Sequence, residues 1–143
     1  MVESGQQPAV QVQLSVRRGR EAVEFYKAAF GAEEVYRFGG TEGHEDVVCQ
    51  LSVNGALFWV EDESPRDGNF SPESIGRSTE RVLLIVDEPT DVLRRAVDLG
   101  ASQVSPVGEE HGWLLGRLDD PYGHRWEIGR PLGPWPPGEG MDP

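Results

Sequence analysis

The residue types that most often carry out chemistry in proteins are few in this sequence, and they are widely separated. The three histidines, His44, His111 and His124, lie in separate turns or loops, without the short spacing of a metal-binding pair. Of these, His111 is our candidate for a functional role, because a loop that connects strands can overhang a cavity. Cys49 lies in an apolar segment and is expected to be a packed thiol. With no Gly-x-Ser-x-Gly elbow and no glycine-rich phosphate-binding loop, the sequence does not favour nucleophilic catalysis.

An internal duplication singles out four other positions. The segments around Trp59 and Glu127 are similar, and both residues lie four positions after a turn glycine. The offset between the two copies is about 68–70 residues along the chain, and it also pairs Gln11 with Arg81. Equivalent positions of a duplicated fold should face one cavity. The chemistry of these four side chains therefore decides between a metal enzyme and a binding protein.

The first half of the chain predicts a strand, a helix and three further strands. Strict alternation over residues 10–16 indicates a half-buried strand that directs Gln11 and Gln13 to one face. Apolar residues at three- and four-residue spacing predict a helix over 20–30, which Gly31 ends. Three strands are expected near 33–38, 46–53 and 56–61, with turns at Gly39-Gly40 and Asn54-Gly55.

The second half repeats this order. A strand is predicted over 81–86 and a helix from Pro89 to Leu99, because proline suits the first turn of a helix. Further strands are expected near 102–107, 113–118 and 124–129, with a turn at 120–123. The halves are joined by the polar stretch 62–79, which is either a lid or binding loop or a simple linker.

The sequence therefore predicts an α+β fold of two βαβββ modules in tandem. We divide the chain into a loose N-terminus (1–8), one domain (9–132) and a Pro- and Gly-rich tail (133–143), which Trp135 could pin to the surface. Within the domain the two modules span 10–63 and 80–132 and are joined by the loop 64–79.

The composition is that of a globular protein with an acidic excess. The formal net charge is −12, and nucleic acids and anionic membranes require basic patches, so we expect neither as a partner. No apolar run has the length of a membrane span, and no signal peptide is visible. The single cysteine excludes an intrachain disulfide, and we expect a cytoplasmic protein.

Two segments carry a resemblance to a known superfamily. Arg20-Glu-Ala-Val-Glu-Phe-Tyr-Lys-Ala-Ala-Phe-Gly-Ala and Asp120-Pro-Tyr-Gly-His-Arg-Trp-Glu-Ile are similar to the vicinal oxygen chelate proteins, which include glyoxalase I, extradiol dioxygenases, fosfomycin-resistance enzymes and bleomycin-binding proteins. Ser71-Pro-Glu-Ser-Ile-Gly and the segment from Gly116 look like the phosphonate-operon-type glyoxalase-like branch. The resemblance implies the glyoxalase/bleomycin resistance fold, a curved mixed sheet around a cavity, and a homodimer.

The same resemblance locates the positions that would hold a metal. Metal-dependent members usually take one ligand from the first strand and one from the last strand of each module, and these positions are Gln11, Trp59, Arg81 and Glu127 in this chain. Only Glu127 is an ordinary ligand, because Trp59 has no donor atom for a metal and Arg81 is a cation. We therefore expect no divalent metal and no other cofactor. We also expect a bidentate pair between Arg81 and Glu127.

Alternate residues of the strands should line the cavity with an aromatic plate and a few polar groups, as in a small-molecule pocket. Trp126 is one residue out of phase with Glu127 and should pack in the core. The candidate ligand-binding residues are Gln11, Gln13, Trp59, Arg81, Trp113, Arg125, Glu127 and His111.

These residues support two main hypotheses. The first is a metal-independent protein that binds a small, partly planar organic molecule, similar to the drug-sequestering antibiotic-resistance members of the superfamily. The alternative is an enzyme of the same fold, a glyoxalase-like lyase or isomerase or a dioxygenase. A metal-free enzyme would use Glu127 as the general base, and this carboxylate would then have to be free of Arg81. A structural or regulatory role stays open beside them.

Overall fold

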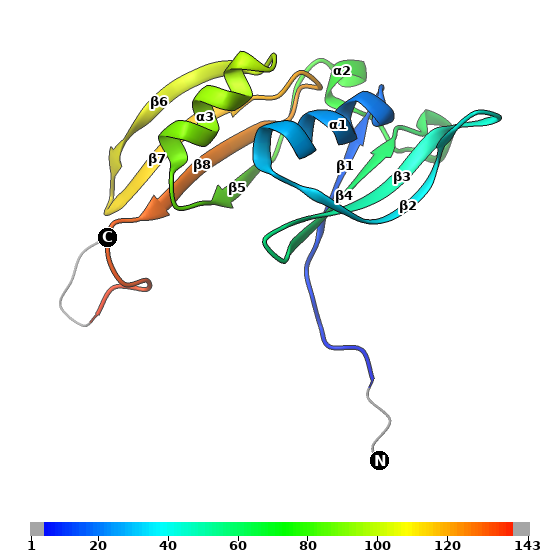
Figure 1. The fold of residues 1–143 in the computed structure, drawn as a ribbon. Helices are drawn as coiled ribbons and strands as arrows, with labels where there is room; N and C mark the ends of the chain where they lie inside the picture. The colour runs from blue at the N-terminus through cyan, green and yellow to red at the C-terminus, as the bar shows by residue number, and fades with distance from the viewer. Residues whose placement is uncertain (1–4, 139–143) are drawn as a thin grey trace.

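The computed structural model describes residues 5–138, and Figure 1 shows two β-sheets with helices on one side of them. Residues 1–4 of the expected N-terminus and residues 139–143 of the tail lie outside the described residues, as does the side chain of His44. The elements are, in chain order, β1 (Val12–Val16), α1 (Gly19–Phe30), β2 (Glu33–Thr41), β3 (His44–Val53), β4 (Ala56–Asp62), η1 (Pro65–Asp67), α2 (Pro72–Ile75), β5 (Arg81–Ile85), α3 (Pro89–Asp98), β6 (Ser102–Glu110), β7 (Trp113–Asp119) and β8 (Arg125–Pro131).

Each half of the chain forms one four-stranded mixed sheet with the same topology. The strand order is β1-β4-β3-β2 in the first sheet and β5-β8-β7-β6 in the second. In each sheet the first strand runs parallel to the last strand, and the other neighbours are antiparallel. The predicted α+β fold of two tandem βαβββ modules is therefore confirmed. We call the part from β1 to β4 the first module and the part from β5 to β8 the second module.

Helices cover one face of each sheet and leave the other face without a helix. Leu14 is buried beneath α1, so the neighbouring Gln13 points to the opposite face. In the second module Leu84 is buried, whereas Leu83 is 44% exposed on the opposite face. On the covered side α1 lies beside α3 (Figure 1). We call the two sides without a helix the open faces, because the predicted site residues lie there.

The turn expected at Gly39-Gly40 is wrong. β2 continues through these glycines to Thr41, and the turn lies at residues 42–43. Gly39 and Gly40 have φ angles of 79° and 71°, and the register with β3 shifts between Gly39 and Thr41. Positive φ angles permit a β-bulge, so the two glycines bend the strand instead of ending it. The turn expected at Asn54-Gly55 is confirmed, with φ angles of 50° and 91°.

The connection between the modules is ordered by contacts with the first sheet. It contains η1 and α2, and the Glu63 carboxylate accepts the backbone N–H of Ser71 at 2.8 Å. Asn69 contacts the Ser15 hydroxyl and donates its amide to Glu61 at 2.9 Å. Because Ser15 and Glu61 belong to β1 and β4, the connection packs across one end of the first open face.

A buried hydrogen-bond network joins the two modules on the covered side. Tyr26 of α1 donates its hydroxyl to Asp120, and the Trp126 indole donates to the same carboxylate oxygen at 2.9 Å. The other oxygen accepts the backbone N–H groups of Tyr122 and His124 at 2.9 and 3.0 Å. These four donors satisfy a carboxylate that is only 4% exposed. Burial and the nearby Asp120 raise the pKa of Tyr26 well above its ordinary value, and Trp126 is confirmed as a core residue.

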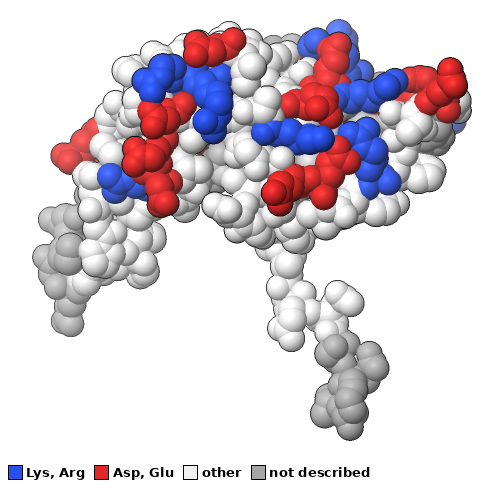
Figure 2. Space-filling view, in the orientation of Figure 1, with Lys and Arg blue, Asp and Glu red and all other residues white. Residues whose placement is uncertain are grey.

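Charged side chains of both signs are mixed on the surface. Figure 2 shows Lys and Arg interleaved with Asp and Glu on one face of the molecule, and ion pairs such as Arg20–Glu45 at 3.0 Å account for this pattern. The acidic excess of the sequence is therefore not gathered into one patch on this face. Of the helices between residues 5 and 138, none has both the length and the apolar character needed to cross a membrane.

Candidate functional site

The first open face carries a tryptophan that is hydrogen-bonded to Gln11, and Gln11 is in turn bound by Gln50. Trp59 of β4 donates its indole N–H to the side-chain oxygen of Gln11 at 2.8 Å, and Gln50 of β3 donates to the same oxygen at 3.1 Å. The ring of Tyr36 lies 6.2 Å from the Trp59 ring, edge to face. Both lone pairs of the Gln11 oxygen are therefore used, and Trp59 is a fixed, half-buried aromatic plate.

The second open face carries an ionic cluster in the corresponding place. Arg81 contacts Glu127 through one pair of atoms, Nε and Oε2, at 3.3 Å, and the Arg81 side chain is 68% exposed. The stronger partner is Arg117 of β7, whose Nε donates to the same Glu127 oxygen at 2.9 Å. The Nη1 and Nη2 groups of Arg117 bind the two oxygens of Glu110 at 2.8 and 2.9 Å. The carboxylates raise the pKa of Arg117, and Arg117 lowers the pKa of Glu110.

The contact between Arg81 and Glu127 is thus confirmed, but the expected bidentate geometry is wrong. Two guanidinium groups share one carboxylate oxygen, and the Glu127 side chain is only 13% exposed. A general base must be free to accept a proton from the substrate. Glu127 is instead engaged by two cations, which does not favour this role.

The strand registers confirm the alignment on which the site prediction rests. Trp59 pairs with Gln13 in the parallel ladder of the first sheet, and Glu127 pairs with Leu83 in that of the second. The antiparallel ladders place Gln50 opposite Trp59 and Arg117 opposite Glu127. Our reading of the sequence missed Gln50 and Arg117, because it considered only the first and last strands of each module. Gln50 and Arg117 are 67 residues apart, one fewer than Trp59 and Glu127, so the alignment alone would not have paired them.

The residues at these positions do not fit a divalent metal. Between residues 5 and 138, no group of three or more His, Cys, Asp and Glu side chains is arranged to hold an ion. Trp59 offers no donor atom, the Gln11 oxygen already accepts two hydrogen bonds, and Glu127 is neutralised by arginines. A metal would have to displace the two hydrogen bonds to the Gln11 oxygen and compete with two arginines for Glu127.

The two clusters are not connected with each other inside one chain. No hydrogen bond, ion pair or ring contact in the described part of the chain links Gln11 or Trp59 with Arg81 or Glu127. The structure therefore brings Gln11 together with Trp59, and Arg81 together with Glu127, but it does not join the two pairs. The assignment of these residues to ligand binding stays a prediction.

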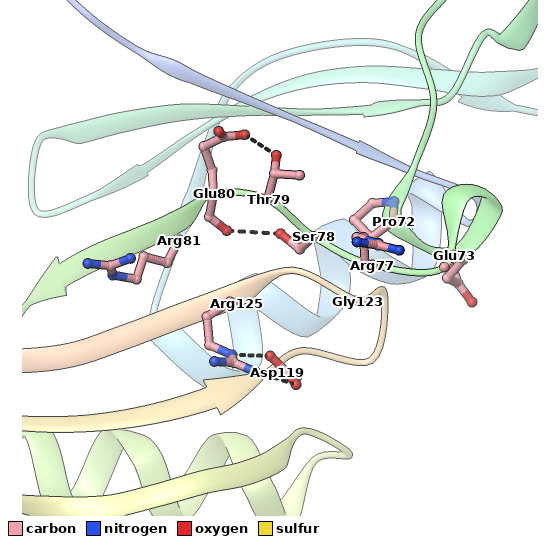
Figure 3. A pocket seen from close by; sticks show the side chains of 11 residues that line it. Pro72, Glu73, Arg77, Ser78, Thr79, Glu80, Arg81, Asp119, Gly123 and Arg125 are labelled. Carbon is pink, nitrogen blue, oxygen red and sulfur yellow. Dashed lines mark hydrogen bonds and ion pairs between the residues drawn. The ribbon is translucent and has the colours of Figure 1, made fainter.

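Two further candidates, Gln13 and Arg125, line two adjoining cavities that share part of the connection as a wall. Gln13 faces a cavity of about 200 Å³ that the connection between the modules closes on one side. Arg125 of β8 forms an ion pair with Asp119 of β7, and both line a larger cavity of about 540 Å³ (Figure 3). Arg81 lines this larger cavity as well.

The last two candidates, Trp113 and His111, lie near the β6–β7 turn. The ring of Trp113 contacts that of Trp135 edge to face, with centroids 5.1 Å apart, which confirms that Trp135 holds the tail against the domain. His111 is exposed in the turn with a φ angle of 50°, and it makes no hydrogen bond with the rest of the described chain. The geometry gives His111 no partner for acid–base chemistry.

Cys49 and His124 contribute to packing and hydrogen bonding within the fold. Cys49 is buried, and burial raises the pKa of its thiol to about 11, so the expectation of a packed thiol is confirmed. The half-buried His124 ring lies with Nε2 at 2.9 Å from the backbone carbonyl of Ser15. Because a carbonyl only accepts, Nε2 carries the proton and links the two modules.

The sequence matches a family model and curated relatives. The model is described as a glyoxalase-like domain, and it matches residues 11–129. An uncharacterized protein of Mycobacterium tuberculosis is 29% identical over 130 residues, which cover 88% of this chain and 76% of that protein. A related uncharacterized protein of Mycobacterium bovis is 29% identical over 130 residues, with 85% of its length covered.

Several solved structures have the same fold. TioX from Micromonospora sp. ML1 aligns with a TM-score of 0.68 and 22% identity over 88% of this chain and 100% of that chain. A gene product from Arabidopsis thaliana aligns with a TM-score of 0.66 and 28% identity over 87% and 100% of the two chains. The fosfomycin resistance protein FosX from Listeria monocytogenes, complexed with Mn(II) and sulfate, gives 0.63 and 16% over 92% and 96%.

Proposed function

This chain belongs to the glyoxalase-like domain family, and on that premise we propose that it is a metal-independent protein that binds a small, partly planar organic molecule. One observation carries the proposal. At the equivalent positions of the two modules the chain has an indole fixed by Gln11 and a carboxylate whose Oε2 is engaged by both Arg81 and Arg117. The first is suited to stacking on a flat ligand, and the second does not fit a metal.

We propose that the complete site forms in a homodimer. Apolar side chains are exposed on both open faces, among them Tyr36 at 51%, Leu83 at 44% and Ile85 at 56%. Several large apolar side chains exposed on one side of a domain are a reason to test that side as an interaction surface. In a two-fold dimer the first open face of one chain would meet the second open face of its partner, and a ligand on Trp59 would be enclosed.

The ligand class that we propose to test first is aromatic antibiotics. The FosX proteins are named as fosfomycin resistance proteins, but at 16% identity they share only the fold with this chain. Trp59 supports an aromatic ligand on physical grounds, because a fixed ring loses little conformational freedom on stacking. The proposal concerns sequestration by binding and includes no chemical step.

The decisive experiment is a titration of the purified protein with a panel of planar antibiotics by isothermal calorimetry and tryptophan fluorescence. At least one compound should bind, and Trp59→Ala should abolish the heat of binding. Trp135→Ala is the matched control, since Trp135 lies on the tail and is 49% exposed. Calorimetry is needed because Trp59→Ala also removes one of the four tryptophans that give the fluorescence signal.

Elemental analysis and chelation complete the experiment. We expect no stoichiometric Zn, Ni, Mn or Fe in the purified protein and no effect of EDTA on the affinity. A full equivalent of metal whose loss abolishes binding would overturn the proposal, as would equal loss of binding in Trp59→Ala and Trp135→Ala.

A further inference from the structure

The cavity of about 540 Å³ lies beside the second open face, between the connection and the strands β5, β7 and β8 (Figure 3). Three of its lining side chains are arginines, namely Arg77, Arg81 and Arg125. In a chain with a net charge of −12 such a concentration of guanidinium groups around one cavity is unexpected. What this cavity binds therefore depends on how many of their N–H groups are already used.

All three arginines keep unused donors. Arg77 makes no hydrogen bond or ion pair with the rest of the described chain. Arg81 uses only Nε, on Glu127, so both of its Nη groups are left over. Arg125 places Nε and Nη2 on Asp119, and its Nη1 is left over. Each guanidinium has five N–H donors in a planar fork, which suits the oxygens of a carboxylate or phosphate.

The carboxylates around the cavity do not offset these donors. Both oxygens of Asp119 are occupied by Arg125. Glu80 accepts the hydroxyl of Thr79 at 2.7 Å, and Figure 3 shows its carboxylate directed away from the arginines. Glu73 is paired with Arg18 at 3.3 Å, and its other oxygen is buried. The lining has three arginines and three carboxylates and is formally neutral, but donors of all three arginines stay unused.

We infer that this cavity binds the anionic group of an organic ligand, a phosphate, phosphonate, sulfate or carboxylate, through Arg77 and Arg125. The Arg81 guanidinium, which Figure 3 shows pointing away from Arg77, lies at the edge of the cavity. A volume of about 540 Å³ exceeds that of a bare oxyanion and leaves room for the organic part. The inference rests on the proposed function, because Arg81 belongs both to this cavity and to the cluster around Glu127. It narrows the ligand from a planar molecule to a planar anion.

The test uses two probes that share one aromatic ring, p-nitrophenyl phosphate and the uncharged p-nitroanisole. Calorimetry in buffer of about 20 mM ionic strength should show at least about tenfold tighter binding of the phosphate ester, and this advantage should shrink as salt is added. Arg77→Gln should weaken the phosphate ester by about tenfold and leave p-nitroanisole unchanged. The fold is not at risk in this variant, since Arg77 makes no contact that the fold needs. Arg66→Gln is the matched control, because it removes the same charge from a side chain that is 92% exposed outside the cavity.

The two proposals fail in different ways. Equal affinity for both probes, or equal effects of Arg77→Gln and Arg66→Gln, would overturn the anion site. Loss of p-nitroanisole binding in Trp59→Ala would in that case still support the proposed function. Binding of the phosphate ester that depends on Arg77 but not on Trp59 would support the cavity and count against stacking on Trp59. Binding of neither probe would overturn the anion site, and the titration with antibiotics would then decide on the proposed function.

Discussion

The two modules have the same backbone plan and opposite chemistry at the place where three strands meet on each open face. In the first module a neutral oxygen of Gln11 receives N–H groups from Trp59 and Gln50. In the second module a charged oxygen of Glu127 takes that place, with Arg117 as its hydrogen-bond donor and Arg81 as an ion-pair partner. The acceptor comes from the residue just before the first strand in one module and from the last strand in the other.

This reversal shows which part of the arrangement the fold fixes. Strand order and register fix a meeting point at which one acceptor faces two donors, whereas the strand that supplies the acceptor and its charge are free to change. A substitution in the neutral cluster removes one hydrogen bond, which lowers the free energy of unfolding by about 1 kcal/mol. An ionic cluster leaves charges without partners, which costs about 3–5 kcal/mol when buried and less at partial exposure. We therefore expect the second module to be the more sensitive of the two.

The largest difference should arise at the turns that precede the last strand of each module. Asp120 accepts four hydrogen bonds and is 4% exposed, whereas the equivalent Ser52 accepts one, from the backbone of Gly55 at 2.9 Å. We expect Asp120→Ala to lower the free energy of unfolding by about 3–4 kcal/mol, because Tyr26 and Trp126 lose their buried acceptor. Ser52→Ala should cost about 0.5–1 kcal/mol. Urea denaturation measures both, and equal costs would show that Asp120 does not join the modules.

A pair of isosteric exchanges tests the two clusters directly. Glu127→Gln should lower the free energy of unfolding by about 1–2 kcal/mol, since Arg81 and Arg117 then face an uncharged amide. Gln11→Glu should cost less than about 1 kcal/mol, because Trp59 and Gln50 also donate to a carboxylate. The measurement is urea denaturation at low and high salt, and the cost of Glu127→Gln should shrink with salt. If Gln11→Glu lowers the free energy of unfolding more than Glu127→Gln does, the neutral cluster tolerates substitution less well than the ionic one.

The sequence predicted the architecture well because its signals are local and occur twice. Alternation of apolar and polar residues and turn residues such as Asn54-Gly55 indicate the local backbone structure. A pattern that occurs in both halves supports the prediction made from either one. The contact of Arg81 with Glu127 was predictable for the same reason. Arg117 was missed because its partners, Glu127 and Glu110, come from β8 and from the far end of β6. No local sequence pattern indicates which arginine is hydrogen-bonded to Glu127. Gly39-Gly40 misled because a bulge and a turn both require positive φ angles.

The dependence of stability on acid pH should reveal a smaller contribution from the first module. Away from its open face the first module has an ion pair in which Arg37 holds the pKa of Glu34 at about 2, below its ordinary value of 4.5. A depressed pKa stabilises the folded state above pH 4.5, and this contribution is lost as the pH falls toward 2. Because the carboxylate is 28% exposed, we expect about 1–2 kcal/mol. Glu34→Gln should therefore lower stability at pH 7 and match the unaltered protein near pH 2. A constant difference from pH 7 to pH 2 would contradict this assignment.

The smallest effect on stability should come from Trp59→Phe. This variant is nevertheless the most informative about ligand binding by the first module. The change removes one N–H donor to Gln11, while Gln50 still donates to the same oxygen, so the free energy of unfolding should fall by about 0.5–1 kcal/mol. The flat ring is kept, so a ligand that stacks on it should lose only a few-fold in affinity, whereas Trp59→Ala should abolish binding. Calorimetry on the two variants separates the ring from its N–H group. If Trp59→Phe is as damaging to binding as Trp59→Ala, the indole N–H contacts the ligand, and the hydrogen bond to Gln11 must open when the ligand binds.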